Sequence, residues 1–247
     1  MTSIKKVEAA KNNLHSPDAK REYNERHFSE AAPEYDRATR LLSLGRDAAW
    51  KCQLIKALPE LTAPHCLDLA CGTGDICFLL AERFHDAQIE GLDLTAEMLL
   101  LAEIRNSFDE RVRFVLGDMG ALPQVDASVD LVTGSYALRN APDLERALQE
   151  INRVLRPGGY AAFLDFSKPD SAFLQALQFR LLKFWGSFCG WWFHRNPAVH
   201  GYISESLRDF LPRSELNTLL DTKGFTRLKA KRFYGGIVEL FVIQKNA

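Results

Sequence analysis

The chain has 247 residues, 47% of them apolar, which suffices for one domain with a sizeable core and added segments but leaves little room for two full domains. Its net charge of −1 provides no general basic field, so nucleic acid is disfavoured as the main partner. The five cysteines form no Cys-x-x-Cys pair and no zinc-type cluster with histidine, which predicts reduced thiols in a cytoplasmic setting, without disulfides and without a metal site.

The N-terminal region, residues 1–60, is predicted to be a helical lid. It lacks the apolar segment of a secretory signal, and no run of the chain approaches about 18 uninterrupted apolar residues, so a transmembrane span is not expected. Between Tyr23 and Leu58, apolar and aromatic residues recur at a spacing that favours two or three short helices over strands. Pro64 ends this region, and we expect a core domain over residues 61–247.

A glycine turn opens the predicted core. The short apolar segment Cys66–Ala70 runs into a Gly-x-Gly turn, and apolar residues recur at helical spacing from Ile76 to Phe84. This order predicts a strand, a tight turn and a helix. Glycine suits Gly72 and Gly74 because it accepts a positive φ and has no Cβ to hold a ligand away, while the helix that follows presents free N–H groups. We therefore expect the turn to bind a ligand.

Acidic residues near the turn indicate the kind of ligand. The dinucleotide fingerprint calls for a small residue where this chain has Cys77, and the Gly-Lys-Ser/Thr sequence of a Walker loop is absent. Asp68 and Asp75 flank the turn, where they would repel a pyrophosphate but could accept hydrogen bonds from an ammonium group. Asp93 follows at about the offset at which an acid at the end of the second strand accepts both ribose hydroxyls. S-adenosyl-L-methionine, which has an ammonium and a sulfonium but no phosphate, is a ligand of this kind.

Alternating strands and helices follow the turn. Further strands are expected at 89–94, 112–116, 129–135, 160–166, 226–232 and 238–243. Helical patterns lie at 95–106, 144–155 and 172–188. The alternation predicts an α/β fold with a doubly wound, Rossmann-like, mostly parallel sheet. The last two strands predict an antiparallel edge strand, and a helical insert at about 171–203 precedes them.

The ends of the predicted strands supply the remaining candidate ligands of the cofactor. In an open sheet of this type, ligands bind outside the carboxyl ends of the strands. That position holds Asp118 and Met119 after the third strand and Ser135 and Tyr136 after the fourth. Asp118 could alternatively cap a turn. The predicted contacts of S-adenosylmethionine are Asp68, Gly72, Thr73, Gly74, Asp93, Asp118, Met119 and Ser135.

With this turn and these acids, the chain resembles the class I S-adenosylmethionine-dependent methyltransferases. Three blocks resemble more narrowly the C-methyltransferases of ubiquinone and menaquinone biosynthesis: Leu138-Arg139-Asn140, residues 152–159 and residues 164–169. The first signature of that family matches at Tyr35-Asp36, Ser43, Gly45 and Trp50-Lys51. The resemblance implies an enzyme that methylates a ring carbon of a polyprenyl benzoquinol or naphthoquinol. An O- or N-methyltransferase of an aromatic natural product and a non-catalytic cofactor-binding member of a biosynthetic complex are the alternatives.

Several positions depart from the family pattern, mostly on the side of the acceptor. Ala38 and Thr39 stand where the family has Met-Asn, and Asp47-Ala48 stands where it has His-Arg. Asp165 replaces a glutamate, and Phe241 replaces a histidine. The cofactor half of the pattern is intact, so the departures imply a relative whose acceptor can differ from that of the family.

The resemblance also implies roles for residues after the fourth strand. Ring methylation needs a phenolate to make the ring carbon nucleophilic, and otherwise depends mainly on placing the acceptor in line with the methyl group. Arg139 is predicted to stabilise the phenolate as a fixed positive charge or to order a water, and Asn140 to orient it. A surface ion pair of Arg139 with Asp143 or Glu145 is the alternative. Tyr35 and Tyr136 are predicted to contact the small aromatic substrate.

Residues 171–200 combine aromatic and basic side chains and contain no acid after Ser171. Part of this segment has the helical spacing of a core face. Trp185, Trp191, Trp192 and Phe193, together with nearby basic residues, favour contact with lipid head groups or a prenyl tail. An insert packed on the sheet or against a second subunit of a homo-oligomer is the alternative. The first interpretation places the protein in the cytoplasm, with peripheral contact at the membrane surface.

Overall fold

A single sheet organises the part of the chain that the computed structural model describes, residues 16–194 and 202–247. Its strands lie in the order β3-β2-β1-β4-β5-β7-β6. They are β1 (His65–Leu69), β2 (Gln88–Asp93), β3 (Val112–Leu116), β4 (Val129–Ser135), β5 (Leu155–Phe166), β6 (Phe225–Phe233) and β7 (Val238–Lys245). This order places β1 and β4 side by side. From this pair, successive strands of the chain are added toward one edge (β2, β3) and then toward the other (β5). A ligand site is expected at the carboxyl ends of such neighbouring strands.

The strands from β3 through β5 are all parallel, and β7 is the strand that runs in the opposite direction. β7 pairs antiparallel with both β5 and β6. The short turn Tyr234–Gly236 joins β6 to β7 and lets them pair as neighbours. Its Gly235 and Gly236 have φ values of 66° and 98°, which glycine adopts readily. The prediction of a mostly parallel sheet with antiparallel pairing at one edge is confirmed, and the antiparallel strand itself lies one position in from that edge.

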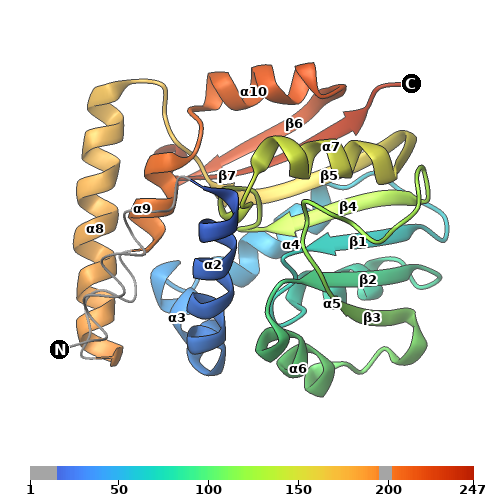
Figure 1. The fold of residues 1–247 in the computed structure, drawn as a ribbon, viewed down its shortest axis with the longest axis horizontal. Coiled ribbons are helices and arrows are strands. Elements are labelled where there is room, and N and C mark those ends of the chain that lie inside the picture. The colour runs from blue at the N-terminus through green and yellow to red at the C-terminus, as the bar shows by residue number, and fades with distance from the viewer. Residues whose placement is uncertain (1–15, 195–201) are drawn as a thin grey trace.

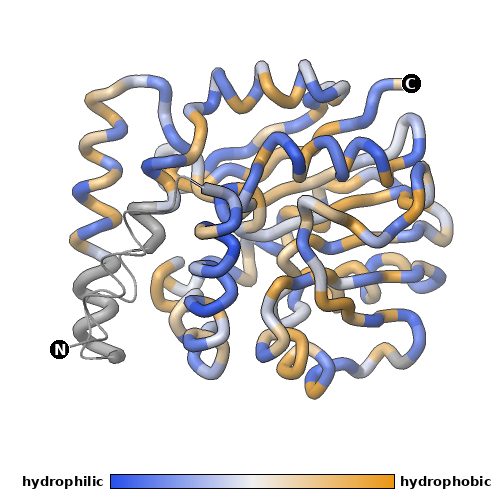
Figure 2. Tube along the Cα trace, viewed as in Figure 1, coloured by the Kyte–Doolittle hydropathy of each residue, from blue (hydrophilic) through white to orange (hydrophobic). Residues whose placement is uncertain are grey.

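Helices cover both faces of the sheet (Figure 1). A hydrophobic core forms on each face. One core packs α4 (Asp47–Ala57) and α5 (Asp75–Arg83) against the strands, with Leu54 and Leu80 completely buried. The opposite core packs α7 (Leu144–Val154) and α10 (Arg213–Thr222), with Leu148 completely buried. α6 (Ala96–Arg105) packs beside β3. Hydrophobic residues accordingly concentrate in the central strands, while most of α2 is hydrophilic (Figure 2).

The remaining helices gather near the ends of the strands where ligands are expected (Figure 1). They are α2 (Pro17–Ala31), the 3-10 turn η1 (Ala32–Glu34), α3 (Tyr35–Leu42), α8 (Ala172–His194) and α9 (Tyr202–Asp209). α8 contacts both α3 and α9. α2 and α3 lie where the sequence predicts a lid, whereas α4 packs into the core, and the division of the chain at about residue 60 remains a prediction.

Two boundaries differ from those expected. β5 begins at Leu155 and includes the Pro157-Gly158-Gly159 segment, because its pairing with β4 shifts register there and absorbs the irregular residues. α8 continues to His194, and the short helices α9 and α10 were not predicted. In the described part of the chain, no helix is long and apolar enough to cross a membrane.

Candidate active site

The glycine turn joins β1 to α5 with three residues in left-handed conformations. Ala70, Gly72 and Gly74 have φ values of 49°, 55° and 88°. A Cβ added to Gly72 would meet only Tyr35, at 3.8 Å, so the backbone there faces open space. A Cβ on Gly74 would lie 2.8 Å from the ring of Phe78, so packing as well as φ demands glycine at the start of α5. Gly72 thus leaves room for a ligand, while Gly74 shapes the turn.

A cavity lies beside this turn, at the carboxyl ends of β1 to β4. Five of the predicted cofactor contacts line it: Gly72, Asp93, Asp118, Met119 and Ser135. A smaller cavity adjoins it and is lined by Asp68, Thr73, Gly72 and Ser135, among others. The two share Tyr35 and Tyr136. The structure therefore brings together the predicted cofactor contacts from four strand ends, and only Gly74 is absent from these two linings in the described residues.

Asp93 is fixed by the backbone of the turn. Its Oδ2 accepts the Gly72 N–H at 2.8 Å, and its Oδ1 accepts the Thr95 N–H at 2.9 Å. Burial raises the pKa of Asp93, although these N–H donors oppose the rise. Each carboxylate oxygen can accept a further hydrogen bond, which is what a ribose diol requires. Asp118 is also held, because its Oδ1 accepts the Gly120 N–H at 2.8 Å.

The two acids that flank the turn differ in their surroundings. Asp68 is buried, and its Oδ1 accepts a hydrogen bond from the Thr133 hydroxyl at 2.7 Å. Burial raises its pKa to about 7. Asp75 instead forms ion pairs with Lys51 at 2.9 Å and Arg105 at 2.6 Å, and these cations outweigh burial and lower its pKa. Asp75 is therefore occupied by the protein's own cations, which argues against the prediction that it accepts a ligand ammonium.

Ser135 supplies a direct sign that the cavity takes a polar ligand. Its Oγ is buried, and no hydrogen-bond partner for it exists in the described part of the chain. A buried hydroxyl without a partner costs about 1–3 kcal/mol, and a hydrogen bond with a ligand or an ordered water removes that cost. The cavity that Ser135 lines together with Asp93 and Asp118 is called the cofactor cavity below. Its lining has these two acids and several apolar residues, and its described part contains no lysine or arginine. These features fit an adenosine without phosphate, as S-adenosylmethionine provides, and Asp93 and Ser135 would hold it.

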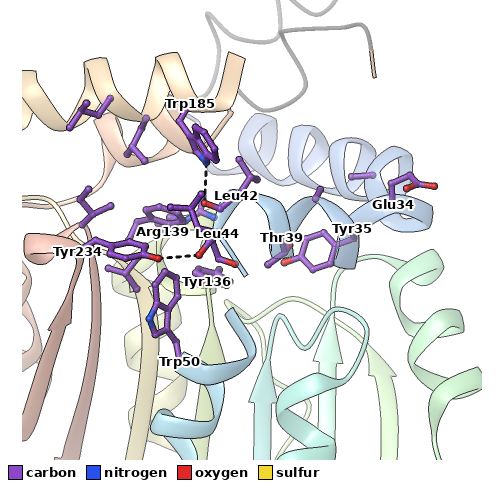
Figure 3. A pocket seen from close by; sticks show the side chains of 18 of the residues that line it. Glu34, Tyr35, Thr39, Leu42, Leu44, Trp50, Tyr136, Arg139, Trp185 and Tyr234 are labelled. Carbon is purple, nitrogen blue, oxygen red and sulfur yellow. Dashed lines mark hydrogen bonds between the residues drawn. The ribbon is translucent and has the colours of Figure 1, made fainter. Parts of the chain in front are cut away.

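A further cavity of about 560 Å³, called the acceptor cavity below, adjoins the cofactor cavity (Figure 3). It lies between α2, α3, α8 and the turn after β6, and most of its lining is apolar. Phe28, Tyr35 and Tyr136 line both this cavity and the cofactor cavity. Figure 3 shows Trp185 of α8 on one wall, where its indole N–H donates to the Leu42 carbonyl at 3.3 Å. The arrangement can hold an apolar molecule against a bound cofactor.

Arg139 lines the acceptor cavity from the 3-10 turn η3 (Leu138–Asn140). It is buried, and its Nε lies 3.0 Å from Asp165 Oδ1. Its Nη1 donates to Ser206 Oγ at 2.7 Å and to Asn140 Oδ1 at 3.2 Å. The surface ion pair considered as an alternative is not formed.

The alternative partners of Arg139 are engaged elsewhere. Asp143 caps α7 by accepting the Arg146 N–H at 3.0 Å, and Glu145 pairs with Lys223 at 3.0 Å. Arg139 is instead a fixed internal cation beside the cavity, and Asn140 lines the cofactor cavity next to it.

Sequence reasoning missed several residues of the site. Asn24 and Phe28 of α2 line the cofactor cavity, and Asn24 Nδ2 donates to the Asn140 carbonyl at 2.7 Å. Lys20 Nζ donates to the Arg139 carbonyl at 3.1 Å. These bonds join positions more than 100 residues apart in the chain, and α2 has no marked apolar face, so no local signal pointed to them.

Comparisons with known proteins agree with this geometry. Demethylmenaquinone methyltransferase from Staphylococcus aureus (strain JH9) is 29% identical over 229 residues, which cover 92% of this chain and 95% of that protein. Among solved structures, a chain of the Haloferax volcanii complex between the Trm112 methyltransferase activator and a methyltransferase matches with a TM-score of 0.66 and 18% identity, over 89% of this chain and 98% of that one. Geranyl diphosphate methyltransferase in complex with GPP and sinefungin matches with a TM-score of 0.61 and 15% identity, over 80% and 78%.

The structural matches, at this identity, establish the fold. The family assignment comes from a sequence model that matches residues 17–245, which is nearly the whole described chain. The chain belongs to the ubiE/COQ5 methyltransferase family.

Proposed function

We propose that the protein methylates a ring carbon of a hydroxylated, prenyl-bearing aromatic of the quinol type, in quinone biosynthesis. The observation that carries this proposal is the apolar cavity of about 560 Å³ that meets the cofactor cavity at Tyr35 and Tyr136. A small polar acceptor would leave most of that volume unfilled. The relative from Staphylococcus aureus carries the name of a quinone-methylating enzyme, which supports an acceptor of this class.

The proposed cofactor site consists of the predicted residues at the strand ends. Asp93 would bind the ribose hydroxyls, and Asp118 and Met119 would lie along the adenine. Ser135 would complete its hydrogen bonding with the ligand, and Asp68 and Thr73 would lie near the amino-acid portion. Bound S-adenosylmethionine supplies a methyl group that its sulfonium has already activated. The protein's part is therefore to orient the acceptor and exclude water.

Arg139 is the residue proposed to stabilise a phenolate. It is the one arginine or lysine in the described lining of the acceptor cavity, and it is positioned through Asp165, Ser206 and Asn140. A preorganised cation in a site with little water acts on developing charge far more strongly than a solvated one. Asn140 fixes this geometry, because its Nδ2 donates to the Tyr136 carbonyl at 2.9 Å while its Oδ1 accepts from Arg139.

The test is product analysis with labelled S-adenosylmethionine and a panel of quinols and phenols with and without prenyl chains. The methyl group should appear on a ring carbon, and prenylated acceptors should have the lowest KM. Arg139→Lys should reduce kcat more than it changes the KM for either substrate. A methyl group on oxygen or nitrogen would favour the natural-product alternative, and cofactor binding without transfer to any acceptor would favour the non-catalytic one.

A second proposal concerns where the acceptor enters: we infer that α8 contacts a lipid surface. Five large apolar side chains of α8 are exposed although they are hydrophobic: Phe173 (76%), Leu174 (49%), Leu177 (47%), Leu181 (50%) and Phe184 (74%). Leu181 and Phe184 also line the acceptor cavity, so the exposed apolar surface is continuous with it. Arg180 and Lys183 lie on the same helix, and no acid lies among residues 172–185. The structure does not describe the side chains of three further aromatic residues that the sequence implicated, Trp191, Trp192 and Phe193.

Co-sedimentation with liposomes tests the lipid contact. The protein should bind anionic vesicles, and binding should weaken at high salt because Arg180 and Lys183 contribute roughly 1 kcal/mol each near anionic lipid. Leu177→Glu should abolish it without changing cofactor affinity. Leu228→Glu is a matched control, since Leu228 is equally exposed, at 47%, but lies on β6. No sedimentation of the wild type, or equal loss in both variants, would contradict the inference.

A further inference from the structure

Asp47 is a buried acid at the start of α4, at a position where the chain departs from the family pattern. Its exposure is 8%, and its N–H donates to Ser43 Oγ at 3.1 Å. Its Oδ2 lies 2.7 Å from Lys51 Nζ, and the same ammonium reaches Asp75 at 2.9 Å. The carboxylate is thus fixed by a paired cation. Asp47 is absent from the described linings of both the cofactor and acceptor cavities, so its link to them runs through another residue.

That residue is Tyr136, whose hydroxyl donates to Asp47 Oδ1 at 2.8 Å. Burial and the neighbouring carboxylate raise the pKa of Tyr136 well above its usual value, so the hydroxyl keeps its proton and remains a donor. A hydrogen bond to a charged, buried acceptor is stronger than one between neutral groups. Asp47 therefore fixes the far end of the Tyr136 ring.

The backbone of Tyr136 is itself in an unfavourable conformation. Its φ is 59°, in the left-handed region that bulky residues rarely adopt, at a cost of order 1–3 kcal/mol. Its N–H donates to the Leu164 carbonyl at 2.7 Å, and its ring lies 5.8 Å from that of Phe166. Strained conformations persist where surrounding contacts hold them. The bond to Asp47 is one of those contacts.

Tyr136 lines both cavities and therefore stands on the boundary that a methyl group must cross. A misplacement of about 1 Å at such a boundary can cost about 100-fold in rate. We propose that Asp47 is a positioning residue that holds the Tyr136 ring on this boundary and so sets the approach of acceptor to cofactor. This proposal rests on the proposed methyl transfer between the two cavities.

The test compares four variants of the whole protein. Asp47→Ala and Tyr136→Phe should each lower kcat by about 10- to 100-fold, and the double variant should be no slower than either single one, because both remove one contact. Asp47→Asn keeps an oxygen that accepts from Tyr136 and should stay within about threefold of wild type, since a neutral acceptor still makes the bond. The control is Glu60→Gln, an exposed acid in an ion pair with Arg83 that should leave kcat unchanged.

A second readout does not depend on turnover. With tyrosine labelled at the ring Cζ, which lies on the axis of ring flips, and with S-adenosylhomocysteine bound, the NMR signal of Tyr136 is assigned from its loss in Tyr136→Phe. This signal should broaden or split in Asp47→Ala but remain a single sharp line in Asp47→Asn. If Asp47→Asn is as slow as Asp47→Ala while its Tyr136 signal stays sharp, the charge matters rather than the hold, and the proposal is overturned. An unchanged signal and kcat in Asp47→Ala would also overturn it. A wild type that methylates no acceptor refutes the proposed function, whereas the NMR comparison still decides whether Asp47 holds Tyr136.

Discussion

Ser135→Ala separates a ligand-binding role from a structural one, because its two expected effects have opposite signs. The Ser135 Oγ is buried without a partner in the described part of the chain. Removing this hydroxyl therefore breaks no internal hydrogen bond. It also removes the cost of burying an unpaired polar group, so the unfolding free energy should rise by about 1 kcal/mol or more. For a chain of this length, 1 kcal/mol corresponds to about 2–4 °C in Tm. The ligand-free variant should melt at or above the wild-type temperature.

The same change should weaken cofactor binding. One net hydrogen bond contributes about 0.5–1.5 kcal/mol, so the Kd for S-adenosylhomocysteine should rise about 2- to 12-fold in calorimetry. Ser167→Ala is the matched control, because Ser167 is also buried but already accepts from Arg213 Nε at 2.6 Å. That variant should lose stability and keep its affinity. If Ser135→Ala melts well below the wild type, or binds cofactor equally well, the assignment of Ser135 as an open ligand position is refuted.

Three further predictions concern buried groups. Arg139→Gln should lower the unfolding free energy by about 3–5 kcal/mol in urea, because it leaves Asp165 buried without its cation. Adding Asp165→Asn should restore most of the stability but should not restore turnover. Because burial raises the pKa of Asp68 to about 7 from an ordinary value of about 4, the folded state holds a proton that the unfolded state releases between those values. Unfolding free energy should therefore fall as pH rises through this window, by an amount on the order of 4 kcal/mol, and Asp68→Asn should flatten the dependence; a wild-type curve without that slope would contradict the assignment. Gly74→Ala should destabilise the protein by about 1–3 kcal/mol, because the new Cβ would lie 2.8 Å from Phe78 at a φ of 88°, and equal stability in denaturant would show that the turn can relax.

The sequence was sufficient for the features that depend on local patterns. Strand positions followed from short apolar runs, and their carboxyl ends then selected Asp93, Asp118 and Ser135, which the structure places in one cavity. The register of the sheet explains this success, since Leu69 of β1 pairs with Leu92 and Gly134 and so aligns the strand ends. The predicted fold class, the methyltransferase family and S-adenosylmethionine as cofactor are confirmed.

What the sequence could not supply were contacts between distant elements. The sequence predicted that Asp75 accepts a hydrogen bond from a ligand ammonium. In the structure Asp75 forms ion pairs with Lys51 and Arg105, which come from two other helices. The bond between Asp47 and Tyr136 spans 89 residues, and neither position has a pattern that predicts it. The helices α9 and α10, of 8 and 10 residues, were also missed.

The aromatic segment shows a different limit. Trp185, expected to contact lipid head groups or a prenyl tail or to pack in the core, lines the acceptor cavity and donates to the Leu42 carbonyl. A helix with two apolar faces presents one stripe to the protein and another to solvent, and composition does not distinguish them. The exposed Phe173 and the cavity-lining Leu182 illustrate the two faces on α8.

The most direct test of the proposed function is methyl transfer to one prenylated naphthalene acceptor presented in its reduced and its oxidised form. With labelled S-adenosylmethionine and the product located by mass spectrometry, the quinol should gain one methyl group on a ring carbon, because its hydroxyl can become a phenolate beside Arg139. The quinone, which has no hydroxyl to deprotonate, should gain none. Equal transfer to both forms, or a methyl group on the quinol oxygen, would contradict ring methylation of a phenolate at this site.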